Sequence, residues 1–139
     1  MSVGDSRIYR LRQGEFQQLT VDHTLGRRLI ATGEMTEQQV GCASSLYQDV
    51  DSTLCASESG SGFDIHHCVS DLRDGDTWLC CTDGISQALP DSALAVLLAE
   101  ASVPGAKVRA ILDAARSTRD SDDNLSAIVV DVRAQFHGA

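Results

Sequence analysis

The chain has 139 residues, of which 42% are hydrophobic and 4% aromatic, and its formal net charge is −9. This length and composition suit one folded domain over residues 1–139 with an aliphatic core, and they exclude a disordered chain. The acidic balance disfavours nucleic acid and anionic membranes as partners. Because no apolar run approaches the ~20 residues of a membrane span, we expect a soluble, cytoplasmic protein.

The first elements form a hairpin. Side chains of alternating character predict a strand over residues 3–11, beginning almost at the first residue. Gly14 marks the turn, and residues 16–20 form the returning strand. Natural domains seldom begin inside a strand, so we expect that upstream chain is missing.

Two short helices are predicted next. Thr24 is placed to cap a helix from Leu25 to about Thr32. Thr36, with a glutamine three residues later, has the spacing of a capping box and predicts a second helix. Residues 44–62 are rich in Ser, Gly and Asp, which indicates a loop or a weak strand.

The second half alternates strands and helices. Residues 63–70 are predicted as a strand, and residues 77–82 form an apolar run that indicates a central strand, ended by Asp83-Gly84. A helix over residues 90–101 and a second helix from Pro104 are predicted, each beginning at a proline. A buried stripe in that last helix and a final strand complete the pattern of an α+β layered domain. The stripe consists of Val108, Ile111, Leu112 and Ala115, and the final strand covers residues 125–132.

Three carboxylates stand out by position. Asp5 lies within the first predicted strand, Asp83 follows the most apolar strand, and Asp123 precedes the last strand. Carboxylates at strand ends in separate segments are a usual source of ligands for Mg²⁺ or Mn²⁺. The alternative is structural, with Asp83 and Asp123 in turns and Asp5 paired with a nearby arginine.

Other reactive side chains favour structural roles. The five cysteines have no zinc-site spacing and are expected to be reduced. His23 is a tempting general acid, but a structural hydrogen-bonding role is favoured. His66 and His67 face opposite ways on a strand and make a poor ligand pair. Arg7 could contact phosphate, although a salt bridge to a nearby carboxylate is favoured.

Four segments of the chain have the form of short sequence motifs. Residues 3–7 are similar to V-G-D-S-R, and residues 19–24 to L-T-x-D-H-[ST]. Residues 82–85 are similar to [ST]-D-G-[LIV], and residues 123–130 to D-N-[IL]-[ST]-x-I-V-V. Each motif alone is weak, but together they resemble the PPM (PP2C-like) serine/threonine protein phosphatases, because the four occur in that family's order and cover nearly the whole chain.

The resemblance implies part of an α/β/β/α sandwich, with two packed antiparallel sheets, outer helices and the early strands missing. It implies that Asp83 and Asp123 bind the first of two core Mn²⁺ or Mg²⁺ ions. Asp5 and Asp83 would hold a weaker third ion, and Gly84 and Asn124 would lie beside the metals. A flap-like insert would span about residues 24–47, next to the active site.

The implied activity is hydrolysis of phosphoserine and phosphothreonine in proteins by a metal-activated water. A phosphoprotein substrate and a cognate serine/threonine kinase would then be partners in signalling. No side chain serves as the nucleophile, and the residues that bind substrate are unknown.

The chain also departs from the family. The family's upstream acidic ligands, its Asp-Gly-x-Gly-Gly turn and its phosphate-binding arginine have no counterpart here. We therefore expect little or no activity from this chain alone, and self-association through exposed sheet. The alternative function is a truncated, phosphatase-like module that binds or regulates a partner without catalysis.

Overall fold

The computed structural model describes residues 1–42, 47, 50, 65–100, 103–118 and 124–134. The chain divides into two compact units. The first unit consists of Met1–Ser6 with Thr20–His67, and the second of Arg7–Leu19 with Cys68–Ala139. No helix in the part of the chain that the structure describes is long and apolar enough to cross a membrane.

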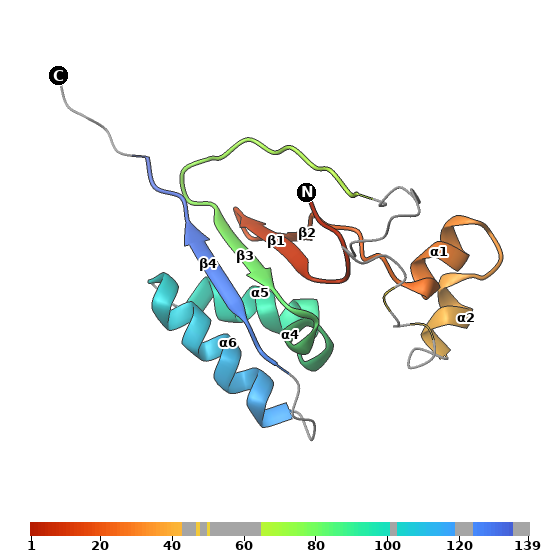
Figure 1. The fold of residues 1–139 in the computed structure, drawn as a ribbon. Coiled ribbons are helices and arrows are strands. Elements are labelled where there is room, and N and C mark those ends of the chain that lie inside the picture. Colours follow the sequence, from red (N-terminus) through yellow and green to blue (C-terminus); the bar gives the residue numbers. More distant parts are fainter. Residues whose placement is uncertain (43–46, 48–49, 51–64, 101–102, 119–123, 135–139) are drawn as a thin grey trace, which may run out of the picture. The chain divides into compact units, whose positions relative to one another are not determined.

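The second unit is built on a four-stranded antiparallel sheet with the strand order β2-β1-β3-β4 (Figure 1). Its strands are β1 (Arg7–Arg12), β2 (Glu15–Gln18), β3 (Thr77–Cys81) and β4 (Ala127–Asp131). The predicted hairpin, central strand and final strand are thus confirmed. Gly14 has a positive φ of 85° at the hairpin turn, a conformation that glycine adopts without steric cost.

Helices α4 (Asp83–Ala88), α5 (Asp91–Glu100) and α6 (Pro104–Thr118) lie on one side of this sheet (Figure 1). The stripe predicted for α6 is confirmed, with Ile111 and Ala115 fully buried and its other two members half-buried. The core between helices and sheet is mostly aliphatic, as the composition predicts. Its largest fully buried apolar side chains are Tyr9, Leu79, Ile85, Leu94, Leu98 and Ile111.

An arginine–carboxylate pair joins the end of β1 to the residue before β3, whereas α4 follows the other end of β3. Arg12 donates through Nε and Nη2 to the two carboxylate oxygens of Asp76, at 2.7 Å each. The main-chain N–H of Arg73 donates to the same carboxylate at 2.9 Å. These hydrogen bonds, with that of Arg12 the largest cause, hold the pKa of the buried Asp76 well below its usual range.

The first unit contains α1 (Leu25–Ala31) and α2 (Glu37–Cys42). Both predicted caps are confirmed. Thr24 Oγ1 accepts from the N–H of Arg27 at 3.4 Å, and the Thr36 N–H donates to Gln39 Oε1 at 2.9 Å. Helix α1 is followed by Thr32 as its C-cap and then by Gly33, whose positive φ of 76° is typical of a helix end.

Two parts of the strand predictions are wrong: the beginning of the first strand, and the described residues of the strand predicted over residues 63–70. Residues 3–6 do not join β1, because Gly4 has a φ of +94° and turns the chain, so that Asp5 precedes the strand. Residues 65–70 contain only an isolated bridge, between His66 and Ser2. The residues that follow His67 are held by side-chain bonds instead of a ladder: Arg10 donates to Ser70 Oγ at 2.9 Å. Most of residues 44–62 lie outside the described part.

Candidate functional site

Asp83 lies where β3 ends and α4 begins. The helix was not predicted, since Asp83-Gly84 indicated only a turn. Asp83 is half-buried, and its Oδ2 accepts from Gln87 Nε2, one helical turn later, at 3.2 Å. Its carbonyl oxygen accepts from Ser86 Oγ at 3.4 Å. The carboxylate is therefore oriented by a neutral amide, a contact that sequence analysis could find only after the helix was recognised.

Thr82 joins this strand end to the segment that leads into β4. Its Oγ1 donates to the carbonyl of Asn124 at 3.3 Å and accepts from the N–H of Ser126 at 3.1 Å. The Thr82 N–H also donates to the carbonyl of Ser126 at 3.1 Å. The motif at residues 82–85 and the end of the motif at residues 123–130 are thus brought together by direct hydrogen bonds.

The type of ligand atom fits a hard metal ion, because Mg²⁺ and Mn²⁺ prefer oxygen ligands such as carboxylates. The number of ligand groups among the described residues is, however, smaller than a metal site needs. Asp123 lies outside the described residues, and those that are described contain no group of three His, Cys, Asp or Glu side chains able to hold a metal. Gly84 is buried beside Asp83, whereas Asn124 is exposed. The described residues therefore do not complete a metal site by themselves.

Asp5 belongs to the other unit. It is half-buried and follows Gly4, whose N–H donates to His23 Nδ1 at 3.0 Å. The His23 N–H donates to the carbonyl of Gly4 at 2.9 Å. The prediction that His23 is a structural, hydrogen-bonding residue is confirmed by these contacts.

The remaining candidates have structural surroundings. Arg7 donates to the hydroxyl of Tyr9 at 3.0 Å, and that hydroxyl donates to Asp91 Oδ1 at 3.1 Å. Cys80 and Cys81 are free thiols that face opposite sides of β3, with Cys81 buried. Burial raises the pKa of the Cys80 thiol, so neither its position nor its ionisation indicates a reactive site.

Comparison with known proteins gives a consistent result, although no family model matches the chain. The serine/threonine protein phosphatase PstP of Mycobacterium tuberculosis is 32% identical over 130 residues, which are 94% of this chain and 24% of that protein. The serine/threonine phosphatase stp of Listeria monocytogenes is 26% identical over 131 residues, covering 94% of this chain and 50% of the relative.

Solved structures agree. The S. agalactiae serine/threonine phosphatase has a TM-score of 0.74 at 28% identity, covering 94% of this chain and 52% of that chain. The catalytic domain of PstP, solved in complex with two manganese ions, has a TM-score of 0.70 at 27% identity and coverages of 95% and 52%. The chain thus spans about half of each matched structure, and half or less of the two relatives. The chain is thus similar, over 94% or more of its length, to part of several serine/threonine protein phosphatases, in sequence and in fold.

Proposed function

We propose that this chain supplies one portion of a metal-dependent phosphatase that hydrolyses phosphoserine and phosphothreonine in proteins. The observation that carries the proposal is the placement of Asp83 at the end of β3, in a motif segment hydrogen-bonded to the one at the start of β4. The similarity to a PstP domain that holds two manganese ions supports Mn²⁺ or Mg²⁺ as the cofactor. In this proposal Asp83, Asp123 and Asp5 are ligands, and a cognate serine/threonine kinase produces the substrate.

We expect this chain alone to have little or no activity. Its described residues hold too few metal donors for a complete site, and it spans only about half of the phosphatases that it resembles. The proposal therefore predicts weak metal binding through Asp83 without efficient turnover.

The test compares the full chain with Asp83→Asn and with Asp113→Asn as a charge-matched control. Asp113 is exposed on α6, and its side-chain contact is an i,i+3 pair with Arg116. Mn²⁺ binding is measured by electron paramagnetic resonance, and hydrolysis with a small aryl phosphate. Weak Mn²⁺ binding that is lost in Asp83→Asn and kept in Asp113→Asn would support the proposal.

Two other results are informative. Hydrolysis that disappears in Asp83→Asn would support the phosphatase assignment and contradict the expected inactivity of this chain. Absence of Mn²⁺ binding in the unmodified chain would contradict the assignment of Asp83 and favour a non-catalytic module.

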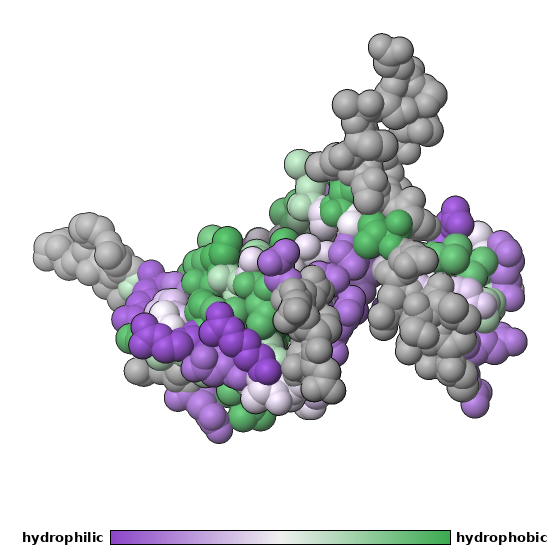
Figure 2. Space-filling model, turned by 60° about the horizontal axis from the view of Figure 1, so that its bottom comes forward, coloured by the Kyte–Doolittle hydropathy of each residue, from purple (hydrophilic) through white to green (hydrophobic). Residues whose placement is uncertain are grey.

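The non-catalytic alternative has one observation in its favour, an exposed apolar strip on β4. Ile128 and Val130 are 65% and 51% exposed, opposite Cys80 and Trp78 on the sheet face away from the helices. Figure 2 shows hydrophobic side chains left on the surface as green patches among purple ones. Self-association through this face predicts a concentration-dependent mass in sedimentation experiments that Val130→Lys abolishes. A concentration-independent monomer would contradict it.

A further inference from the structure

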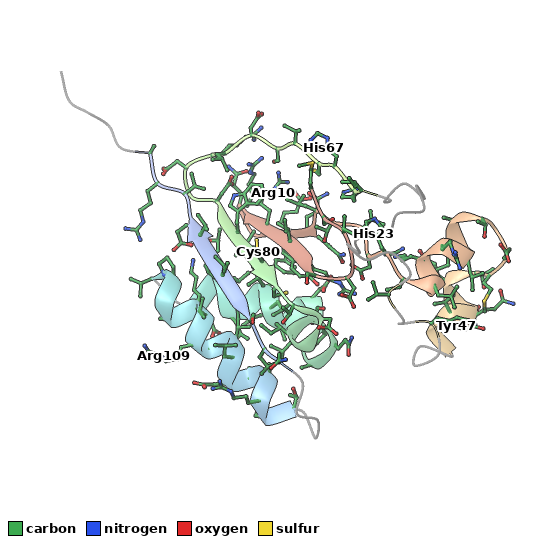
Figure 3. The ribbon with its side chains drawn as sticks, viewed as in Figure 1. Arg10, His23, Tyr47, His67, Cys80 and Arg109 are labelled. Carbon is green, nitrogen blue, oxygen red and sulfur yellow. The ribbon has the colours of Figure 1, made fainter. Side chains whose placement is uncertain are left out.

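The turn that carries Asp5 is hydrogen-bonded to His23, a residue labelled in Figure 3. The N–H of Gly4 donates to His23 Nδ1 at 3.0 Å, and the His23 N–H donates back to the carbonyl of Gly4 at 2.9 Å. Both polar groups of the Gly4 main chain are thus bound to one histidine, which closes a small ring between segments 19 residues apart.

The conformation of Gly4 explains why this turn needs a partner. Its φ of +94° is open to glycine and unfavourable for other residues. A Cβ built on Gly4 would meet no atom within 4 Å, so the glycine is required by backbone conformation and not by lack of space. A flexible residue holds one conformation only where the surroundings fix it, and the two His23 bonds provide that restraint.

His23 is placed to act as a firm anchor. Its side chain is only 7% exposed, and it lies between Asp22, which is buried, and Thr24, the cap of α1. Since the donor is a main-chain N–H, Nδ1 must be the acceptor, and the ring proton then lies on Nε2. The same short segment therefore begins α1 and holds the Gly4 turn.

We propose that His23 is a positioning residue for Asp5, which fixes the main chain from which this carboxylate projects and ties it to the start of α1. The inference rests on the proposed function only in that Asp5 is one of the proposed ligands. His23 itself takes no part in chemistry. The role depends on an acceptor atom at the place of Nδ1 and not merely on a ring that fills the site.

The experiment compares two variants of the full chain by NMR amide hydrogen exchange. His23→Asn keeps an acceptor oxygen near the position of Nδ1, whereas His23→Phe keeps the ring and removes the acceptor. We expect protection of the Gly4 amide to fall about tenfold or more in His23→Phe, because the half-buried Gly4 N–H is left without its hydrogen-bond acceptor. Protection in His23→Asn should stay near that of the unmodified chain. Equal protection in all three proteins, or equal loss in both variants, would overturn the proposal.

A second readout separates this inference from the proposed function. Mn²⁺ broadening of the Asp5 amide signal is recorded in the same samples. Broadening in the unmodified chain and in His23→Asn, but only at higher Mn²⁺ concentration in His23→Phe, would support both proposals. If Mn²⁺ leaves the unmodified chain unchanged while the exchange results hold, the assignment of Asp5 as a ligand fails and the anchoring role of His23 stands.

Discussion

Lys107 offers a sharp test of how α6 is attached to the sheet. Its Nζ donates to Asp131 Oδ1 at 2.7 Å and to Thr77 Oγ1 at 3.0 Å, and the Thr77 hydroxyl donates to the same carboxylate oxygen at 2.7 Å. The side chains of Lys107 and Asp131 are only 7% and 12% exposed. Because Thr77 and Asp131 are partners in the β3–β4 register, this lysine holds two strands at once.

Lys107→Met keeps the length of the side chain and removes the ammonium group. The carboxylate of Asp131 then stays largely buried with a hydroxyl as its remaining donor, and removing one partner of a buried ion pair costs about 3 kcal/mol or more. Replacing both charged groups, in Lys107→Met with Asp131→Leu, should recover most of that loss because no buried charge remains. Arg116→Met is the control, since it breaks the exposed pair with Asp113 and should change stability by less than about 1 kcal/mol.

The assay is urea unfolding followed by the fluorescence of Trp78, the single tryptophan of the chain. Burial opposes the ionisation of Asp131, but hydrogen bonds from Lys107 and Thr77 outweigh it and lower the pKa of this carboxyl below its usual value. Its stabilising effect is therefore present above the ordinary aspartate pKa of about 4 and is lost as pH falls through the lowered value. The difference between the unmodified chain and Lys107→Met should be largest near neutral pH and shrink in acid.

Two results would refute this reasoning. A loss in Lys107→Met no greater than in Arg116→Met would show that the pair is not effectively buried. A double variant at least as unstable as Lys107→Met would show that lost packing, and not an uncompensated carboxylate, causes the destabilisation.

Two further predictions concern the packing of each unit. In Gly26→Ala the new Cβ would lie 2.8 Å from Val40 Cγ1 and 3.1 Å from the carbonyl oxygen of Tyr47. We therefore expect limited proteolysis to cleave the unit with α1 and α2 faster in this variant than in the unmodified chain. Gly105→Ala is the control, because its Cβ would meet no atom within 4 Å and should leave the cleavage rate unchanged. Tyr9→Phe removes the hydroxyl bound to Arg7 and Asp91 and should cost about 1 kcal/mol at neutral pH. Burial raises the pKa of Tyr9, so its hydroxyl stabilises the fold below the ordinary value of about 10 and less as pH rises above it. The difference in urea unfolding between Tyr9→Phe and the unmodified chain should therefore shrink in alkali, and a constant difference would contradict it.

The elements that could be predicted are those whose local signals agree with their packing. The apolar run over β3 indicated a central strand, and β3 lies between β1 and β4. Thr24 and Thr36 mark helix starts because their side chains bond the first turn, a purely local effect. The stripe on α6 is long enough for its period to be recognised.

The elements that were missed depend on contacts distant in sequence or on very short segments. Gly4 leaves the strand pattern because His23 holds its turn, which alternation of side chains cannot reveal. Helix α4 has six residues, fewer than two turns, so its period was not visible behind the turn signal of Asp83-Gly84. For the site, the choice of Asp5, Asp83 and Asp123 as ligands came from the sequence motifs and stays a prediction, whereas the contacts of Thr82 and Gln87 came only from the structure.

The two described candidate ligands, Asp5 and Asp83, both lie beside a main-chain segment that is held by hydrogen bonds between two motifs. Asp5 follows a turn closed by His23, and Asp83 follows Thr82, whose hydroxyl bridges to the segment before β4. In each case a neutral side chain from a motif segment bonds the main chain of another motif segment. If a lysine or arginine held either backbone segment instead, its charge would pair with the nearby carboxylate and compete with a metal ion. His23 and Thr82 fix the backbone without forming such an ion pair. In both motif pairs a residue without a carboxylate, His23 or Thr82, therefore fixes the main chain beside a candidate ligand.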